Sequence, residues 1–229
     1  MAQIVCIIGN KGGTGKTTLS HLLAHGLGLF GKYACAVLTD IDRQPLAKVN
    51  RNYLPFDARQ ADNVERAVSK LRAAQNWYGV VDGGGNRPQM DAVLATLADL
   101  VLVPFRDSHE DMRTLVRDLT RFPNAWALPS QWPSNPLQRG SAERSLDLLL
   151  GPLRNRLLQP VYAQSATKLL LQHELPAQLP TALNDSARIL ALQVIERLRI
   201  PLGDRWAPVA KQRSTGFDPL PLDDKQQAA

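Results

Sequence analysis

Short apolar runs alternate with amphipathic stretches through the first half of the chain. Runs of four to six largely apolar residues predict strands buried on both faces of a sheet, and they cover 4–8, 34–39, 78–81 and 100–103. Between them, apolar residues recur at helical spacing, which predicts helices over 17–30, 62–75, 88–97 and 107–121. This alternation predicts the α/β fold class, with a mostly parallel, twisted sheet flanked by helices.

The second half of the chain gives a weaker pattern, because 12 of the 16 prolines lie at or after Pro123. We expect a strand at 126–128, a loop at 129–140, a helix at 141–154 capped by Ser141, a strand near 157–163 and a helix over 182–199. The buried face of that last helix is expected to hold Ile189, Leu190, Val194 and Leu198. We expect the chain to form one domain over 1–217, followed by a mobile tail over 218–229.

A glycine- and lysine-rich loop connects the first predicted strand to the first predicted helix. This segment, 9–18, has the sequence GNKGGTGKTT, and its position is that of a phosphate-binding loop. Its glycines let backbone N–H groups turn inward, and the start of the next helix adds a positive dipole. Lys16 would reach the β- and γ-phosphates, and the Thr17 hydroxyl would bind Mg²⁺. We therefore expect a domain of the P-loop NTPase type.

Carboxylates follow the next two predicted strands. Asp40 and Asp42 come after the second strand, and Asp82 ends the third. In a parallel sheet, ligands bind outside the carboxyl ends of the strands. Asp82 would hold Mg²⁺ there, as the corresponding carboxylate does in other P-loop enzymes.

The loop departs from the usual pattern G-x-x-x-x-G-K-[ST] at its first position, where Asn10 stands, and carries an additional lysine, Lys11. This form, K-G-G-x-G-K-T, resembles the deviant Walker-A motif of the ParA/MinD family of ATPases. The stretch DIDRQP at 40–45 is similar to the D-x-D-P-Q stretch of that family, and VVDGGG at 80–85 is similar to its Walker-B motif. The resemblance covers about residues 1–120. It departs at Arg43, where the family has proline, and at Gly83-Gly84, where it often has proline or alanine. The extra glycines would either loosen the loop or admit a nearby backbone.

The resemblance implies a sandwich of two chains around two ATP molecules, with Mg²⁺. Lys11 would contact the nucleotide of the other chain, and Asp42 would position the attacking water. Asp40 would lie closer to the metal. The implied catalytic residues are Lys11, Lys16 and Asp42, and the implied metal ligands are Thr17, Asp40 and Asp82. The implied ATP-binding residues are Lys11, Gly12, Gly13, Thr14, Gly15, Lys16, Thr17 and Thr18.

Charge adds a candidate partner. The chain has 27 Lys+Arg against 21 Asp+Glu, a net charge of +6, and an excess of base favours acidic partners such as nucleic acid. The resemblance implies a short ParA-like ATPase that binds nonspecific DNA and hydrolyses ATP when an adaptor protein stimulates it. Its cargo would be a plasmid, a chromosome or a protein assembly. Because the loop begins at residue 9, we expect no helix-turn-helix before it. Candidate DNA contacts are Arg188, Arg197, Arg199, Arg205, Lys211 and Arg213.

Other functions stay open. A MinD-like membrane ATPase would be favoured by a basic amphipathic helix at the C-terminus, but the chain ends DDKQQAA at 223–229. An accessory ATPase of a secretion, pilus or cellulose system would have the same fold. A dethiobiotin-synthetase-like ligase also fits the loop. A nitrogenase-type iron protein needs cysteines at its dimer face, whereas Cys6 and Cys35 lie in strand-like runs.

Several features carry a simpler interpretation. Cys6 and Cys35 are expected to be buried free thiols. His21 and His25 share a helix face but lack further ligands for a zinc site, and Trp132 is expected to pack in the fold. The sequence shows neither a signal peptide nor a run of 18 apolar residues. We expect a cytoplasmic protein, associated with the nucleoid if it binds DNA.

Overall fold

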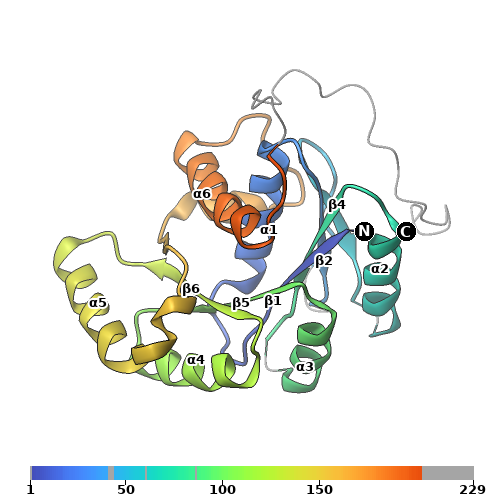
Figure 1. Cartoon of the computed structure of the whole chain (residues 1–229). Helices are drawn as coiled ribbons and strands as arrows, with labels where there is room; N and C mark the ends of the chain where they lie inside the picture. Colours follow the sequence, from blue (N-terminus) through green and yellow to red (C-terminus); the bar gives the residue numbers. More distant parts are fainter. Residues whose placement is uncertain (1, 41–43, 60, 86, 203–229) are drawn as a thin grey trace.

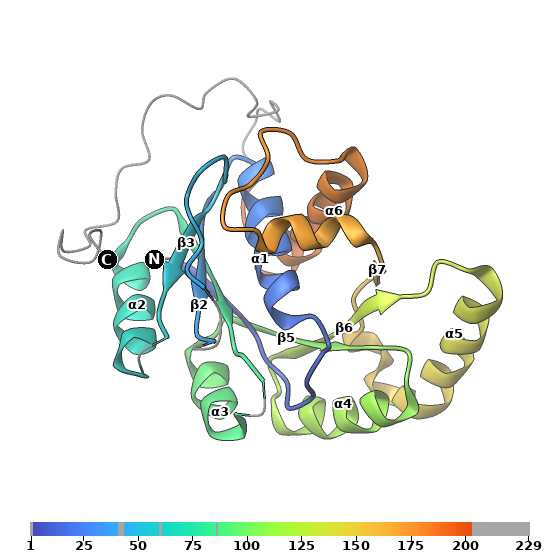
Figure 2. The same ribbon diagram turned by 180° about the vertical axis from the view of Figure 1, so that it is seen from behind.

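The strands form one parallel sheet. The computed structural model describes residues 2–40, 44–59, 61–85 and 87–202. Seven strands in this part of the chain pair in the order β3-β2-β4-β1-β5-β6-β7 (Figures 1 and 2). Their bounds are β1 Gln3–Ile7, β2 Tyr33–Leu38, β3 Leu54–Asp57, β4 Trp77–Asp82, β5 Leu100–Phe105, β6 Ala125–Trp132 and β7 Val161–Tyr162. Every pairing is parallel, so all carboxyl ends meet at one edge. The predicted fold class is confirmed.

Helices cover both faces of the sheet (Figures 1 and 2). On one face lie α1 (Lys16–Leu29) and α6 (Thr181–Arg197), with the short 3-10 segment η2 (Ser165–Leu171). On the other face lie α2 (Ala61–Ala73), α3 (Pro88–Leu97), α4 (His109–Arg121) and α5 (Pro136–Leu150), followed by the 3-10 segment η1 (Gly151–Arg156). None of the helices in the described residues is long and apolar enough to cross a membrane.

The central strand β1 belongs to both cores. Cys6 and Ile8 face the core under α2–α5, whereas Val5 and Ile7 face the core under α1 and α6. This explains the uninterrupted apolar run at the start of the chain, because alternate side chains enter opposite cores. The helix α1 is buried on almost all sides, since α6 covers the side that turns away from the sheet.

Two prolines lie inside strands that we expected to end at them. Pro104 pairs within β5 and Pro129 within β6, so the predicted loop over 129–140 is wrong at both ends. The helix α5 begins at Pro136, and the side chain of Asn135 caps it by accepting hydrogen bonds from the N–H groups of the first turn. Pro is well suited to the first helical position because no N–H is needed there. Ser141, the expected cap, therefore lies inside the helix.

One strand was missed by the sequence pattern, and the buried face of α6 differs from the predicted one. The short strand β3 escaped prediction, because its sequence Leu-Pro-Phe-Asp contains two residues that are rare in strands. On α6, Leu190 and Val194 are buried as expected, but Ile189 is 50% exposed. The buried face passes instead through Leu183 and Ala187, one turn apart. The proposed tail over 218–229 lies outside the described residues.

Candidate nucleotide-binding site

The topology gathers the predicted site at one edge of the sheet. Across β1, β4 and β2, the residues Ile7, Asp82 and Leu38 are direct neighbours in the ladder. Three parts of the site therefore lie at the same level of the sheet: the loop after β1, the Asp82 side chain and the segment Thr39-Asp40. This brings Lys16 and Thr17 to the same edge as Asp40 and Asp82. Asp42 lies outside the described residues.

The loop before α1 presents backbone donors. Gly13 and Gly15 have φ angles of 75° and 86°, a left-handed conformation that glycine adopts without strain. Gly15 directly precedes the helix, and no side chain of the described residues caps this helix start. The first turn contains no acidic residue either. Its N–H groups are thus oriented for an anion.

Lys16 is held inside the loop. The residue is 6% exposed, and its Nζ donates to the carbonyl oxygen of Lys11 at 2.7 Å. Burial lowers the pKa of Lys16, while nearby carboxylates, above all Asp91 and Asp82, act in the opposite direction. The ammonium therefore lies among carboxylates and a carbonyl, and phosphate oxygens can replace the carbonyl as its acceptor.

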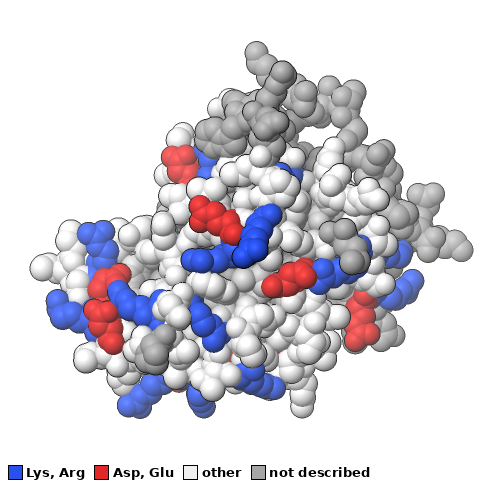
Figure 3. Space-filling model, viewed as in Figure 1, with Lys and Arg blue, Asp and Glu red and all other residues white. Residues whose placement is uncertain are grey.

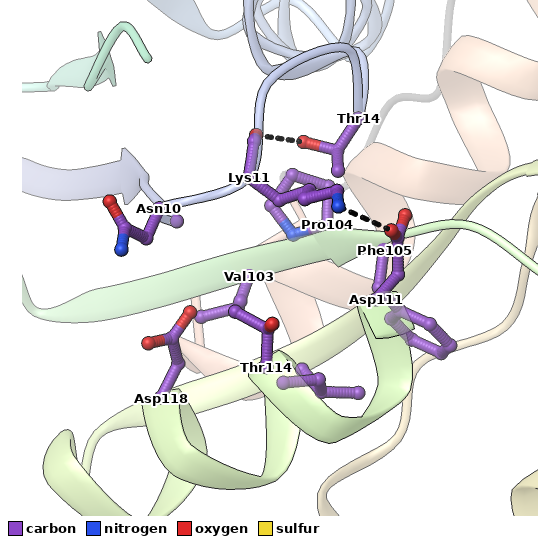
Figure 4. Close-up of a pocket in the computed structure, with 11 residues that line it drawn as sticks. Asn10, Lys11, Thr14, Val103, Pro104, Phe105, Asp111, Thr114 and Asp118 are labelled. Carbon is purple, nitrogen blue, oxygen red and sulfur yellow. Dashed lines mark hydrogen bonds and ion pairs between the residues drawn. The ribbon is translucent and has the colours of Figure 1, made fainter. Parts of the chain in front are cut away.

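Lys11 is bound to the start of α4. Its Nζ lies 2.7 Å from Oε1 of Glu110. It also lies 4.0 Å from Oδ1 of Asp111, the contact that Figure 4 shows. Burial raises the pKa of Asp111, but hydrogen bonds from Arg106 and Ser108 outweigh burial, so the pKa lies below its ordinary value. Asp111 is thus an ionised carboxylate already engaged with Arg106, and Glu110 is the main partner of Lys11.

Asp82 ends β4 and is fully buried. Its Oδ1 accepts a hydrogen bond from the N–H of Gly84 at 3.3 Å. The hydroxyl of Thr39 donates to the Asp82 carbonyl at 2.6 Å, which ties the ends of β2 and β4 together. The negative charge of Asp82 raises the pKa of Lys16, against the effect of burial. The two predicted site residues are therefore close enough to interact electrostatically.

The glycines after Asp82 now have a physical reason. The N–H of Gly83 donates to the Ile7 carbonyl at 2.9 Å, and a Cβ at Gly83 would lie 2.9 Å from that same oxygen. Gly84 has a φ of 71°. The loop is therefore not loosened; it follows β1 so closely that a side chain at position 83 has no room. This decides between the two alternatives that the sequence left open.

Two carboxylates near Lys16 were missed. Asp91, on α3, is 4% exposed, and burial raises its pKa to about 6, against the opposing effect of Lys16. Burial also raises the pKa of Asp118, on α4. Asp118 lines a cavity of about 10 Å³ between the loop and α4 (Figure 4), the size of one water molecule. Neither residue gave a sequence signal, because each resembles a solvated carboxylate on an amphipathic helix.

A bulge in β6 brings a third unpredicted residue to the loop. The register of β6 against β7 shifts between Ser130 and Trp132, and Gln131 between them has a φ of 51°. Its Nε2 donates to the Gly13 carbonyl at 3.1 Å. Bulges often redirect a side chain toward a functional site. Trp132 itself is fully buried against Phe105.

A larger cleft opens beside Thr17. Its volume is about 280 Å³, and it is lined by Thr17, His21, Leu38, Gln44, Pro45, Leu46, Leu171 and His173. His21 makes a 2.8 Å hydrogen bond to Tyr53, and Arg51 donates to the same hydroxyl at 2.6 Å. This buried chain connects α1 to η2, because Arg51 also donates to the carbonyl of Leu170.

The remaining chemistry-bearing residues serve the core. His25 forms hydrogen bonds with Asn52 and Asn184, and no group of three potential metal ligands occurs in the described residues. Cys6 and Cys35 are buried and free, as predicted. Burial raises the pKa of Cys35 to about 12, so this thiol is unreactive at neutral pH.

The candidate DNA contacts do not form one patch in the described part of the chain. Arg188 donates to Asp185 at 3.0 Å, and the guanidinium of Arg197 lies 3.9 Å from the ring centroid of Trp126. Nine residues separate the two arginines, which places them about half a turn apart around α6. Arg199 is exposed beyond the helix end. Arg205, Lys211 and Arg213 lie outside the described residues.

Neither a protein-family model nor a curated protein matches the chain, but solved structures do. An ATP complex of McdA from Cyanothece is 16% identical with a TM-score of 0.61, covering 87% of this chain and 97% of that one. MinD from Aquifex aeolicus is 14% identical with a TM-score of 0.66, covering 85% and 97%. Cobyrinic acid a,c-diamide synthase from Mycobacterium smegmatis, solved with an ATP analogue and magnesium, is 15% identical with a TM-score of 0.56, covering 91% and 99%. This chain has the fold of McdA and MinD, as the resemblance to the ParA/MinD family implies.

Proposed function

We propose that the chain is a Mg²⁺-dependent ATPase of the ParA/MinD type, with its nucleotide at the carboxyl edge of the sheet. The observation that carries the proposal is the loop at the start of α1: an uncapped helix start, left-handed glycines and two lysines, all beside Asp82. The hydroxyl of Thr17 and the carboxylates of Asp40 and Asp82 are oxygen ligands, the type that Mg²⁺ prefers. Bound Mg²⁺ would neutralise phosphate charge during hydrolysis.

Each loop residue has a distinct role in this proposal. The backbone N–H groups of Gly12, Gly13 and Gly15 hold the phosphate oxygens, together with those of Thr14, Thr17 and Thr18. Lys16 exchanges the Lys11 carbonyl for phosphate and spreads positive charge onto oxygens where negative charge develops. Asp42 positions the attacking water.

Hydrolysis would require two chains, because Lys11 acts on the nucleotide of the other chain. In this structure Lys11 is bound to Glu110 of its own chain. We propose that ATP-dependent pairing withdraws Lys11 from that carboxylate. The pair would then bind duplex DNA without base specificity, and an adaptor protein would stimulate hydrolysis to position or segregate a cargo. The net charge of +6 supports the DNA clause.

The test measures oligomeric state by light scattering, and hydrolysis by phosphate release, with Mg²⁺ and either ATP or ADP. We expect ATP to produce dimers and ADP monomers. Lys16→Ala should lose nucleotide binding, whereas Lys11→Ala should bind ATP but not hydrolyse it. Lys168→Ala, an exposed lysine on η2, is the control and should behave as the unmodified protein.

Normal hydrolysis by Lys11→Ala would refute the role of this lysine in the other chain's site. Turnover that stays first order in a monomer, without ATP-dependent pairing, would favour a metabolic enzyme with the same fold instead.

A further inference from the structure

The helix α4 carries a row of arginines on its exposed side. Arg113, Arg117 and Arg121 are all exposed and recur every four residues, so they follow one side of the helix over about 12 Å. Figure 3 shows Lys and Arg side chains spaced along the lower edge of the molecule, where α4 runs in Figure 1. We call these three residues the α4 arginine row.

The row forms no close ion pair among the residues that the structure describes. None of the ion pairs in that part of the chain includes its members. Arg117 donates to the Thr114 hydroxyl, and Arg121 lies over the ring of Phe122.

The acidic residues of α4 leave the row positive. Glu110, on the same side at the helix start, is paired with Lys11 in this structure; once ATP-dependent pairing withdraws Lys11, Glu110 offsets one of the three positive charges of the row. Asp111 is paired with Arg106, and Asp118 turns toward the loop, where it lines the small cavity (Figure 4). Asp118 interacts electrostatically with Arg117 and Arg121 without forming an ion pair with either, so the three guanidinium groups keep an excess of positive charge.

We propose that the α4 arginine row binds the phosphate backbone of duplex DNA, an inference that rests on the duplex-binding clause of the proposed function. A guanidinium binds phosphate through two parallel hydrogen bonds and stays charged at every physiological pH. Four residues of helix rise by about 6 Å, close to the roughly 6.8 Å between alternate phosphates along the axis of one DNA strand. Such contacts carry no base specificity.

Other occupants fit less well. A helix that lies on a membrane needs an apolar face in the lipid. On α4, however, Met112, Leu115 and Leu119 are buried in the core, and Val116 packs against it. The α4 arginine row therefore presents positive charge at the surface, but no apolar side chains that could insert into lipid. The described arginines of α6 are less suited, because Arg188 has a carboxylate partner and Arg197 lies on a tryptophan at a different side of the helix.

The test compares two triple variants that lose the same charge. One removes the row and the other removes exposed arginines of α2 and α5; they are Arg113→Gln/Arg117→Gln/Arg121→Gln and Arg66→Gln/Arg139→Gln/Arg144→Gln. Fluorescence anisotropy measures the binding of a labelled duplex of arbitrary sequence with Mg-ATP across a range of salt. We expect the row variant to bind at least about tenfold more weakly. Its slope of log affinity against log salt should fall by about 3 per chain, since each lost phosphate contact removes about 0.9.

Two further measurements keep the result unambiguous. Thermal melting establishes that each variant folds. Replacing the row by lysines, Arg113→Lys/Arg117→Lys/Arg121→Lys, should restore the salt slope and most of the affinity, because the charge returns without the two-pronged geometry.

Three outcomes would overturn the inference. In the first, the row variant and the control variant lose affinity equally. In the second, only Arg188→Gln/Arg197→Gln/Arg199→Gln weakens binding. In the third, the row binds phosphatidylserine vesicles and not duplex. A wild-type protein that dimerises with ATP but binds no duplex at any salt refutes the DNA clause of the proposed function itself, which is a separate result.

Discussion

At the scale of single residues, the ion pair of Lys11 affects the balance between monomer and dimer. Its ammonium, which we propose acts on the other chain's nucleotide, is bound here to Glu110, whose side chain is 78% exposed. An ion pair of this exposure is worth about 0.2–1 kcal/mol, so it biases dimerisation without preventing it. The ion pair between Lys11 and Glu110 would favour the monomer until ATP is present.

Removing that carboxylate should therefore favour the active dimer. We expect Glu110→Gln to lower the protein concentration for half-maximal ATP hydrolysis by up to about thirtyfold, because forming the dimer breaks two such ion pairs, each worth up to about 1 kcal/mol. Hydrolysis rates across a dilution series measure the effect. Glu65→Gln, an exposed carboxylate on α2, is the control and should leave the curve in place. An unchanged curve for Glu110→Gln would mean that this ion pair does not restrain Lys11.

Asp91 should make the stability of the nucleotide-free protein depend on pH. The folded state keeps its proton up to about pH 6, whereas the unfolded chain loses it near pH 3.8. The folded state thus binds more protons in this window, and the free energy of unfolding falls as the pH rises through it. Asp91 lowers the free energy of unfolding by about 1–3 kcal/mol across this window. Its stabilising contribution is therefore fully present below pH 3.8 and lost above pH 6.

The variant Asp91→Asn isolates the effect, because it keeps the shape and removes the titration. We expect urea unfolding of the variant to show a smaller loss of stability between pH 4 and pH 7 than the unmodified protein shows. Equal losses in both proteins would assign the pH dependence to other carboxylates.

At the scale of elements, the contact between α1 and α6 depends on one missing side chain. A Cβ at Gly26 would lie 2.1 Å from the Ala187 carbonyl oxygen, and a backbone atom cannot move aside cheaply. We expect Gly26→Ala to lower the free energy of unfolding by about 2–4 kcal/mol, measured by urea denaturation. Gly140→Ala is the matched control on α5, where the new Cβ would meet only the end of the Arg144 side chain at 3.7 Å. It should be neutral or stabilise by up to about 1 kcal/mol. A mild effect at Gly26 would show that the two helices can separate.

Elements were predictable where local pattern and burial agree. The strand at 78–81 and the helix at 88–97 emerged because most of their apolar residues pack against a core; Val93, which is 40% exposed, is an exception. The pattern failed where tertiary context overrides local preference: Pro129 is accommodated in β6, and Ile189 is exposed although it follows helical spacing. Asn135 before Pro136 carried a helix-start signal that the dense prolines around it obscured.

At the scale of the whole molecule, the site was predictable only as far as strand ends identify it. The phosphate loop follows β1 and Asp82 is the last residue of β4, so parallel topology alone brings them to one edge. Asp91, Asp118 and Gln131 reach the same edge from two helices and a bulge, which no short motif encodes. The same limit applies to the α4 arginine row, because its excess of positive charge depends on how the acidic residues of α4 are placed in the fold.

The strand order also has a consequence for synthesis on the ribosome. Of the strands that the structure describes, β1 is made first and pairs with β4 and β5, so residue 82 must be added before β1 can pair along its length with β4. At roughly 5–20 residues per second, the apolar segment 4–8 spends several seconds without its sheet neighbours. During that time α1, which follows β1 directly and contacts it in the fold, can cover it.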